Sequence, residues 1–430
     1  MALNFLKYYL LSCENLSKKQ EKNHLKMTPA VRYEKAITTV VKKLGEQLTF
    51  QTSKRTVKNR IFKGPMSEAS TKFDNADLKS SGIPDKRFVN FFEKWGAGGF
   101  GLISTGMILL DENGRGMFPG NMIIGSNEDS EERRAAFRAI VDAVKPHNTI
   151  LVGQLGNIAD VYRYFALEDN NDESAVRAAL KDGLYAAKFL ADCGFDGTSI
   201  AVFPGQFDKN KKLLKDIINL IRKEVNDPSF VVGIKLSTAR LQQGDTSIEE
   251  TFKLIEVINN AGYDFMEIAG GSYEFPVATD ADRENRFREV VHGAKKYAPK
   301  TAIYIGGGVR KVKTMEKLVS DKIVDGICMA RPSASEFDLP LKILGNHIPS
   351  TLVLPFENDM MGGVLAAAAQ INQAGQTSLK EANGDVNKGI MNLNDNTTLE
   401  KFNAAKAIFT ANAAAAKEEG KPFPGVIVVD

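Results

Sequence analysis

The chain has 430 residues, of which 43% are hydrophobic and 25% charged, and its formal net charge at pH 7 is +3. This composition excludes a disordered or fibrous protein, and the small net charge gives no reason to expect a nucleic-acid partner. No apolar run is long enough to span a bilayer, so no membrane span is expected. The length favours one long domain with extensions over several domains of average size.

The cysteines and the N-terminal stretch bear on the cellular compartment. Cys13, Cys193 and Cys328 are odd in number and widely spaced, which predicts neither a disulfide framework nor a zinc site, and no metal is expected. The first apolar stretch is interrupted by Lys7 and shows no small-residue cleavage site, unlike a secretory signal. These features predict a cytoplasmic protein.

The chain begins with a predicted extension over residues 1–44, which ends in a helix over residues 32–44. From Asn59 onward, short β-branched apolar runs alternate with amphipathic stretches. The runs are continuous rather than alternating in hydrophobicity, as in parallel strands covered on both faces. Eight runs are predicted as strands: residues 60–64, 101–109, 150–154, 198–203, 231–237, 265–269, 302–305 and 326–330.

The stretches between the strands predict helices, because apolar residues such as Phe252, Ile255 and Ile258 recur at three- and four-residue spacing. The clearest cover residues 128–145, 174–193, 208–225, 248–261 and 280–297. Eight strand–helix units predict a (β/α)8 TIM barrel over residues 45–348, with a doubly wound open sheet as the alternative. Residues 349–430 do not continue the alternation of strand and helix patterns, and they contain an alanine-rich stretch over 399–419. They predict a C-terminal helical appendage, used for packing or for docking a partner.

The last two predicted strands each end in a feature suited to phosphate. Residues 302–305 run into the glycines at 306–308, and residues 326–330 run into Arg331. Glycines let backbone N–H groups approach an anion closely, and an arginine can bind phosphate through two hydrogen bonds. Barrels of this class favour phosphate at the loops after strands seven and eight. The alternative is a tight turn beside a surface ion pair.

Polar side chains also fall at other strand ends, where barrel enzymes carry their function. Ser67 follows the first strand, Gln154 ends the third, and Lys235 lies near the end of the fifth. Together they suit a flat heterocycle with several hydrogen-bonding edges, and the lysine suits a place where negative charge develops. Each has a plainer explanation when taken alone; Lys235, for example, could simply pair with Glu267.

Several of these motifs resemble those of the old yellow enzyme (NADH:flavin oxidoreductase) family of FMN-binding TIM barrels. The resemblance covers residues 45–345 and is carried by GPMSE at 64–68, QLG at 154–156, VVGIKLSTARLQQGD at 231–245, AGYDFMEIAGGSYE at 261–274 and ICMARP at 327–332. It implies an enzyme that transfers hydride from NADH or NADPH, through FMN, to a small molecule such as an activated alkene or a quinone. The resemblance is compatible with a homo-oligomer as well as with a monomer.

The resemblance also implies which residues bind FMN, without a covalent link. Gln154 would bond the pyrimidine edge of the ring, Lys235 would stand by N1/O2, and Arg331 would hold the phosphate. The complete set is Pro65, Met66, Ser67, Gly106, Gln154, Lys235, Gly271, Gly307, Gly308 and Arg331.

The stretch after the fourth strand departs from the family. Ala201 and Pro204 stand where family members have a His-x-x-His/Asn pair that orients the substrate, and Gln206 replaces the proton-donating tyrosine. None of these three can act as an acid.

Asn157, which replaces a family histidine, could still donate a hydrogen bond, and Tyr162, Tyr164 or Tyr273 could supply a proton. Asn157 and Tyr273 are taken as the catalytic candidates. The departure favours one alternative, a non-catalytic flavin-binding barrel (a pseudoenzyme). A second alternative, independent of it, is a phosphate-binding lyase or isomerase without flavin.

Overall fold

The computed structural model describes residues 31–74, 76–110, 119–156, 158–202, 207–238, 247–271, 274, 281–357 and 359–429. The chain divides into two compact units, Met1–Val31 and Arg32–Asp430. All the strands and helices named below belong to the second unit. The division of residues 32–430 into an extension, a barrel and an appendage remains a prediction.

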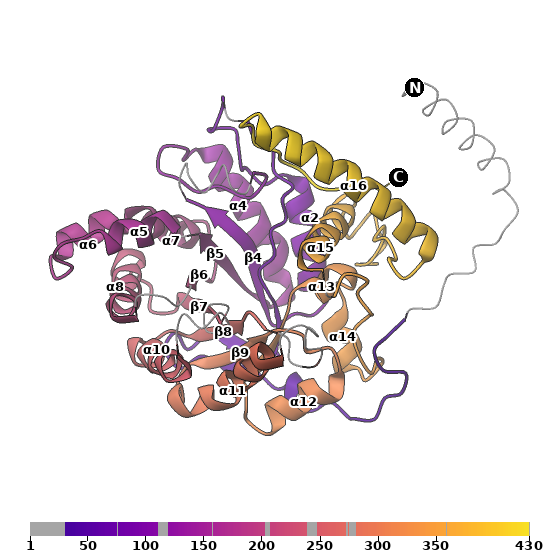
Figure 1. Cartoon of the computed structure of the whole chain (residues 1–430), viewed down its shortest axis with the longest axis horizontal. Helices are drawn as coiled ribbons and strands as arrows, with labels where there is room; N and C mark the ends of the chain where they lie inside the picture. The colour runs from indigo at the N-terminus through magenta and orange to yellow at the C-terminus, as the bar shows by residue number, and fades with distance from the viewer. Residues whose placement is uncertain are drawn as a thin grey trace, which may run out of the picture. The chain divides into compact units, whose positions relative to one another are not determined.

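Eight parallel strands close into a barrel in the order β10-β3-β4-β5-β6-β7-β8-β9 (Figure 1). The TIM barrel predicted from the sequence is confirmed, and the open doubly wound sheet is excluded. Each predicted strand agrees with an observed one to within two residues at either end. The strands are β3 (Ile61–Lys63), β4 (Leu102–Leu109), β5 (Ile150–Gly156), β6 (Gly197–Val202), β7 (Val231–Ser237), β8 (Phe265–Ala269), β9 (Ala302–Gly306) and β10 (Gly326–Met329).

Helices surround the barrel where the periodicity predicts them, except that one predicted helix is divided into two. The stretch over 174–193 forms two helices rather than one, because the backbone leaves the helical conformation at Leu180. Helices α2, α5 and α12 are additional to the five named stretches, and two short helices, α13 and α14, follow β10. The helices around the barrel are α2 (Lys86–Ala97), α4 (Glu131–Val144), α5 (Ile158–Phe165), α6 (Glu173–Ala179), α7 (Lys181–Asp192), α8 (Phe207–Val225), α10 (Ile248–Ala261), α11 (Ala281–Tyr297), α12 (Val312–Ser320), α13 (Arg331–Ser335) and α14 (Leu339–Leu344).

Local sequence fixes the ends of α10 particularly clearly. Ser247 accepts a hydrogen bond from the backbone N–H of Glu250, and the Glu250 side chain bonds back to the Ser247 backbone. Gly262 ends the helix in the left-handed conformation at φ +86°, which glycine adopts without steric cost. The predicted bounds of this helix, residues 248–261, are therefore those observed.

The N-terminal end of the barrel is closed by apolar side chains. Phe62, Phe265 and Tyr304 are fully buried within one cluster, and Phe62 meets the other two rings edge-on at 5.6 and 5.4 Å between centroids. Phe50, from the turn of the hairpin β1 (Leu48–Thr49)–β2 (Thr56–Val57), packs on Phe265 at 5.9 Å. Since Phe265 is the first residue of β8, the hairpin covers the N-terminal end, which leaves the carboxyl ends of the strands for a binding site.

The helix predicted over residues 32–44 is wrong. Arg32 forms an isolated β-bridge with Leu352, and its guanidinium binds Glu336 with an Nη2–Oε1 distance of 2.6 Å. The backbone N–H groups of residues 42–44 donate to the Glu316 carboxylate. Hydrogen bonds to distant parts of the chain have thus replaced the intrahelical bonds that local propensity favours.

The C-terminal region is helical, as predicted, but contains one more helix than expected. The predicted helix over 399–419 is α16 (Asn396–Glu418), and α15 (Met360–Gly375) precedes it. Helix α15 packs against α2 and α13, and α16 lies along the outside of α15 (Figure 1). Phe402 is buried in this contact, whereas Ile408 of α16 is exposed.

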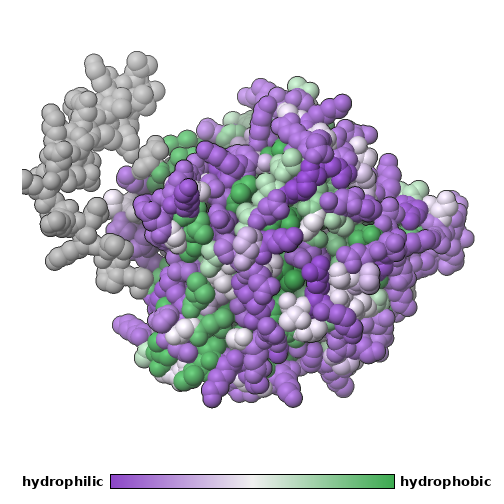
Figure 2. Space-filling model, turned by 180° about the vertical axis from the view of Figure 1, so that it is seen from behind, coloured by the Kyte–Doolittle hydropathy of each residue, from purple (hydrophilic) through white to green (hydrophobic). Residues whose placement is uncertain are grey.

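The face of the molecule seen in Figure 2 is mostly hydrophilic, with smaller groups of hydrophobic side chains between the hydrophilic ones. Within the described parts of the chain, no helix combines the length and the hydropathy needed to cross a bilayer.

Candidate functional site

The polar residues predicted to bind a cofactor gather at one rim of the barrel. Because all eight strands are parallel, their carboxyl ends lie at the same side. The ten predicted residues all fall within the described residues, in the second half of a strand or just beyond its end: Pro65, Met66 and Ser67 after β3, Gly106 in β4, Gln154 in β5, Lys235 in β7, Gly271 after β8, Gly307 and Gly308 after β9, and Arg331 after β10.

The side-chain donor of Gln154 has no acceptor within the described parts of the chain. The residue is 6% exposed, and its backbone N–H donates to Thr105 Oγ1 at 3.0 Å. Its side-chain Nε2 is buried and has no hydrogen-bond partner among the described residues. A buried donor left without an acceptor costs about 1–3 kcal/mol, so such groups are rare in folded proteins. The position suits a ligand that brings an acceptor.

Lys235 lies beside a buried carboxylate. It is paired in register with Glu267 on the neighbouring strand β8, and the Nζ–Oε1 distance is 3.4 Å. The Glu267 side chain is 5% exposed and that of Lys235 28%, so the lysine is the one open to a ligand. Cys328 of β10 is buried near Glu267, and burial raises the pKa of this thiol well above its ordinary value. The Lys235–Glu267 ion pair, which the sequence offered as the plainer explanation for this lysine, is therefore present. Both residues lie toward the carboxyl ends of the barrel strands.

Gly106 is required by the packing of two strand ends. A Cβ at this position would overlap the backbone carbonyl of Met66 and the carboxylate of Glu68. The Gly106 N–H donates to Glu68 Oε1 at 2.7 Å. Burial raises the pKa of Glu68, against the opposing influence of Lys63. Glu68 is therefore a buried support for the rim, and no periodicity or spacing around it predicts this role.

The loops after β8 and β9 touch through their glycines. A Cβ at Gly307 would overlap the carbonyl oxygen of Gly271, and Gly308 has φ +59°. The Glu274 carboxylate accepts hydrogen bonds from the backbone N–H groups of Arg310 and Lys311, at 2.6 and 2.9 Å. Small residues are thus needed for the close approach of the two loops, on the side of the rim where phosphate binding is predicted.

Arg331 is held by residues that the sequence analysis did not single out. Its Nη1 donates to the Phe356 carbonyl at 3.0 Å, and its Nη2 lies 3.2 Å from Glu357 Oε1. Arg310 binds the same carboxylate at 2.7 Å, and the Tyr33 hydroxyl donates to Glu357 Oε2 at 2.8 Å. Burial would raise the pKa of Glu357, but Arg310 and Arg331 outweigh it and hold this pKa below its usual range. Arg331 is in a half-buried cluster rather than in a surface ion pair.

Part of the predicted catalytic region lies outside the described residues. This applies to Asn157 and Tyr273, and to Pro204 and Gln206 of the divergent stretch. Ala201 is described, and its Cα is paired with that of Lys235 across β6 and β7. A methyl group therefore stands next to the lysine where a family member would carry a hydrogen-bonding side chain.

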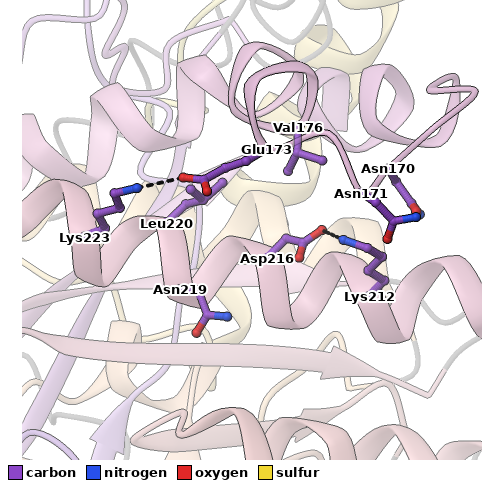
Figure 3. A pocket seen from close by; sticks show the side chains of 9 residues that line it. All are labelled: Asn170, Asn171, Glu173, Val176, Lys212, Asp216, Asn219, Leu220 and Lys223. Atoms are coloured by element: carbon purple, nitrogen blue, oxygen red, sulfur yellow. Dashed lines mark hydrogen bonds and ion pairs between the residues drawn. The ribbon is translucent and has the colours of Figure 1, made fainter.

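A separate groove of about 310 Å³ lies between α6 and α8 (Figure 3). Its charged side chains neutralise each other: Lys212 binds Asp216 at 2.8 Å, and Lys223 binds Glu173 at 2.7 Å. None of the ten predicted cofactor residues lines it.

The chain is similar to known flavin enzymes over most of its length, although no protein-family model matches it. It is 24% identical over 387 residues to the NADH-dependent flavin oxidoreductase nadA of Aspergillus parasiticus, with 77% of this chain and 85% of that protein covered. The resemblance inferred from the sequence is confirmed by this relative.

Solved structures share the barrel. The old yellow enzyme homologue of Zymomonas mobilis (NCR) superimposes with a TM-score of 0.56 at 15% identity, covering 73% of this chain and 95% of that one. A 2-naphthoyl-CoA reductase in complex with 2-naphthoyl-CoA gives a TM-score of 0.57 at 16% identity, covering 72% of this chain. This chain spans about half, 53%, of that reductase. At these identities the likeness establishes a common fold.

Proposed function

We propose that this protein is an FMN-dependent oxidoreductase that transfers hydride from NADH or NADPH, through the flavin, to an activated alkene, a quinone or a similar acceptor. The observation that carries the proposal is the buried Nε2 of Gln154, which has no hydrogen-bond partner among the described residues and lies on the same rim as Lys235. The similarity to a NADH-dependent flavin oxidoreductase over 77% of the chain supports it.

The residues at the rim fit FMN. The pyrimidine edge of a flavin carries the acceptor that Gln154 Nε2 lacks, and N1 and O2 are the atoms that Lys235 would meet. Close glycine loops and Arg331 at the neighbouring strand ends suit the phosphate, which distinguishes FMN from riboflavin.

Bound flavin would supply the two-electron chemistry, accepting a hydride from the nicotinamide and passing it to the acceptor. The protein provides orientation and charge. Gln154 fixes the ring by its pyrimidine edge, Arg331 anchors the phosphate, and Lys235 stabilises negative charge at the N1/O2 edge. Buried Cys193 and Cys328 are both free thiols, which suits the reducing cytoplasm that we propose as its location.

Proton delivery separates the candidate acceptors. Reducing an alkene requires a proton at carbon, whereas the two oxygens of a quinone can take protons from water. With Ala201 beside Lys235, the usual orienting side chain is replaced by a methyl group. We therefore expect quinones to be reduced faster than alkenes, by a factor in the range of general-acid catalysis, about 10²–10⁴.

The test is NADH and NADPH consumption by the FMN-loaded protein, with menadione and with cyclohexenone as acceptors. Consumption that depends on the acceptor and on bound FMN supports the proposal. The alternative that Ala201 favours is a non-catalytic flavin-binding barrel, and it predicts bound FMN with no consumption with either acceptor. A protein that does not take up FMN contradicts both.

A further inference from the structure

The positive charge of Lys235 is not available in full to a ligand at the rim. Glu267 faces it across paired strands, at 3.4 Å from Nζ to Oε1. Attraction between opposite charges is stronger where the surroundings exclude water than at an exposed surface, and the Glu267 side chain is 5% exposed. Glu267 therefore offsets part of the lysine's charge.

The surroundings hold Glu267 in place. A Cβ at Gly306 of the next strand would overlap Glu267 Oε1 in its present position, so the glycine lets the carboxylate lie close against β9. On the other side of β9, the buried Cys328 of β10 interacts electrostatically with it. A carboxylate confined in this way has little freedom to leave Lys235.

Other charges lie near the pair. Lys63 is fully buried and interacts electrostatically with both Lys235 and Glu68. The end of the barrel thus holds two lysines and two carboxylates. Removing Glu267 alone would leave an excess of positive charge next to the predicted N1/O2 position.

We propose that Glu267 is a positioning residue that lowers the reduction potential of the bound flavin. The inference rests on the proposed function. A hydride from NADH carries two electrons and a proton, leaves NAD⁺, and adds one negative charge to the flavin. This charge gathers at the N1/O2 edge. A lysine with no counter-charge would stabilise it more than Lys235 does beside Glu267, so Glu267 favours passing the hydride onward to the acceptor.

The test is the reduction potential of FMN bound to the wild type and to Glu267→Gln, measured anaerobically by equilibration with a reference dye. We expect the preference for binding reduced rather than oxidised FMN to be at least tenfold greater in the variant than in the wild type. For a two-electron couple this is a rise of about 30 mV. Glu267→Asp, which keeps the charge, should stay nearer the wild type.

Asp264→Asn is the matched control. Asp264 is a buried carboxylate just before the first residue of β8, and it binds Arg222 at 2.9 Å. Removing the Asp264 charge disturbs a buried ion pair at the opposite end of the same strand. It should leave the reduction potential of bound FMN unchanged. If Glu267→Gln does not fold, Glu267→Met removes the same charge without needing hydrogen-bond partners and carries the same expectation.

An unchanged or lower potential in the charge-removing variant, with FMN still bound, overturns this inference alone. So does an equal shift in Asp264→Asn. A wild type that binds no FMN overturns the proposed function as well.

Discussion

Arg331 and Glu357 lie 3.2 Å apart between Nη2 and Oε1, so the predicted phosphate-binding arginine is already oriented by a carboxylate. The same carboxylate binds Arg310, which follows β9. Glu357 consequently connects the loops after the last two barrel strands. It also receives the Tyr33 hydroxyl, which brings the segment before the barrel to the same point.

Replacing Arg331 with alanine should weaken FMN binding and leave riboflavin binding nearly unchanged, because riboflavin has no phosphate. A hydrogen bond to a charged group contributes about 1.5–3 kcal/mol, so the FMN dissociation constant should rise about 10–100-fold. Titration of the apoprotein with each flavin measures both effects.

The matched control for this prediction is Arg138→Ala, since Arg138 is a more exposed arginine paired with Glu131 on α4. It should change neither affinity. Undiminished FMN affinity in Arg331→Ala, or an equal loss for riboflavin, would show that Arg331 does not bind the phosphate.

Replacing Gln154 with leucine should move stability and binding in opposite directions. Leucine removes a buried donor that has no acceptor among the described residues, so the apoprotein should gain about 1–3 kcal/mol in free energy of unfolding. FMN affinity should fall, because the bond to the pyrimidine edge is lost. Thermal unfolding without flavin and FMN titration measure the two effects. A less stable apoprotein with normal FMN affinity contradicts a ligand-binding role for Gln154.

Lys63 should make stability depend on pH above neutrality. It is fully buried, donates to the Ser104 carbonyl at 2.9 Å and lies 4.1 Å from the centre of the Trp95 ring. Burial lowers its pKa from 10.5 to about 8. Between these values the unfolded chain binds more protons than the folded one, so folding becomes more favourable as pH rises.

The comparison for this prediction is Lys63→Met. The wild type should gain stability relative to the variant between pH 8 and pH 10.5, by about 3 kcal/mol in total. Below pH 8 the difference should be constant, since the lysine is protonated in both states. Urea unfolding at several pH values measures it. A difference that does not change across this interval would mean that Lys63 keeps an ordinary pKa.

The bounds of the strands could be predicted closely because buried parallel strands consist of continuous runs of apolar residues. Gln154, Lys235 and Arg331 follow from these strands, since their positions at the ends place them on one rim. The helix over 32–44 was wrong because Glu316 and Glu336, far along the chain, take up the hydrogen bonds and the charge of this segment.

Helix α15 was missed for another physical reason. Its sequence, MMGGVLAAAAQINQAG, holds three glycines and no amphipathic stripe. Small residues let it pack closely on its neighbours, and Gly363 lies against Arg331 where a Cβ would not fit. Except for Glu267, the carboxylates that contact the site residues could not be predicted from the sequence either. Glu357 and Glu68 belong to no periodic pattern, and only the fold brings them to the rim.

The most direct test of the flavin-dependent hydride transfer is the visible spectrum of the FMN-loaded protein, titrated with NADH in the absence of oxygen. We expect the oxidised flavin band to disappear as NADH is added and to return when a quinone is admitted. A band that persists under excess NADH would contradict the account and identify a barrel that binds flavin without turning it over.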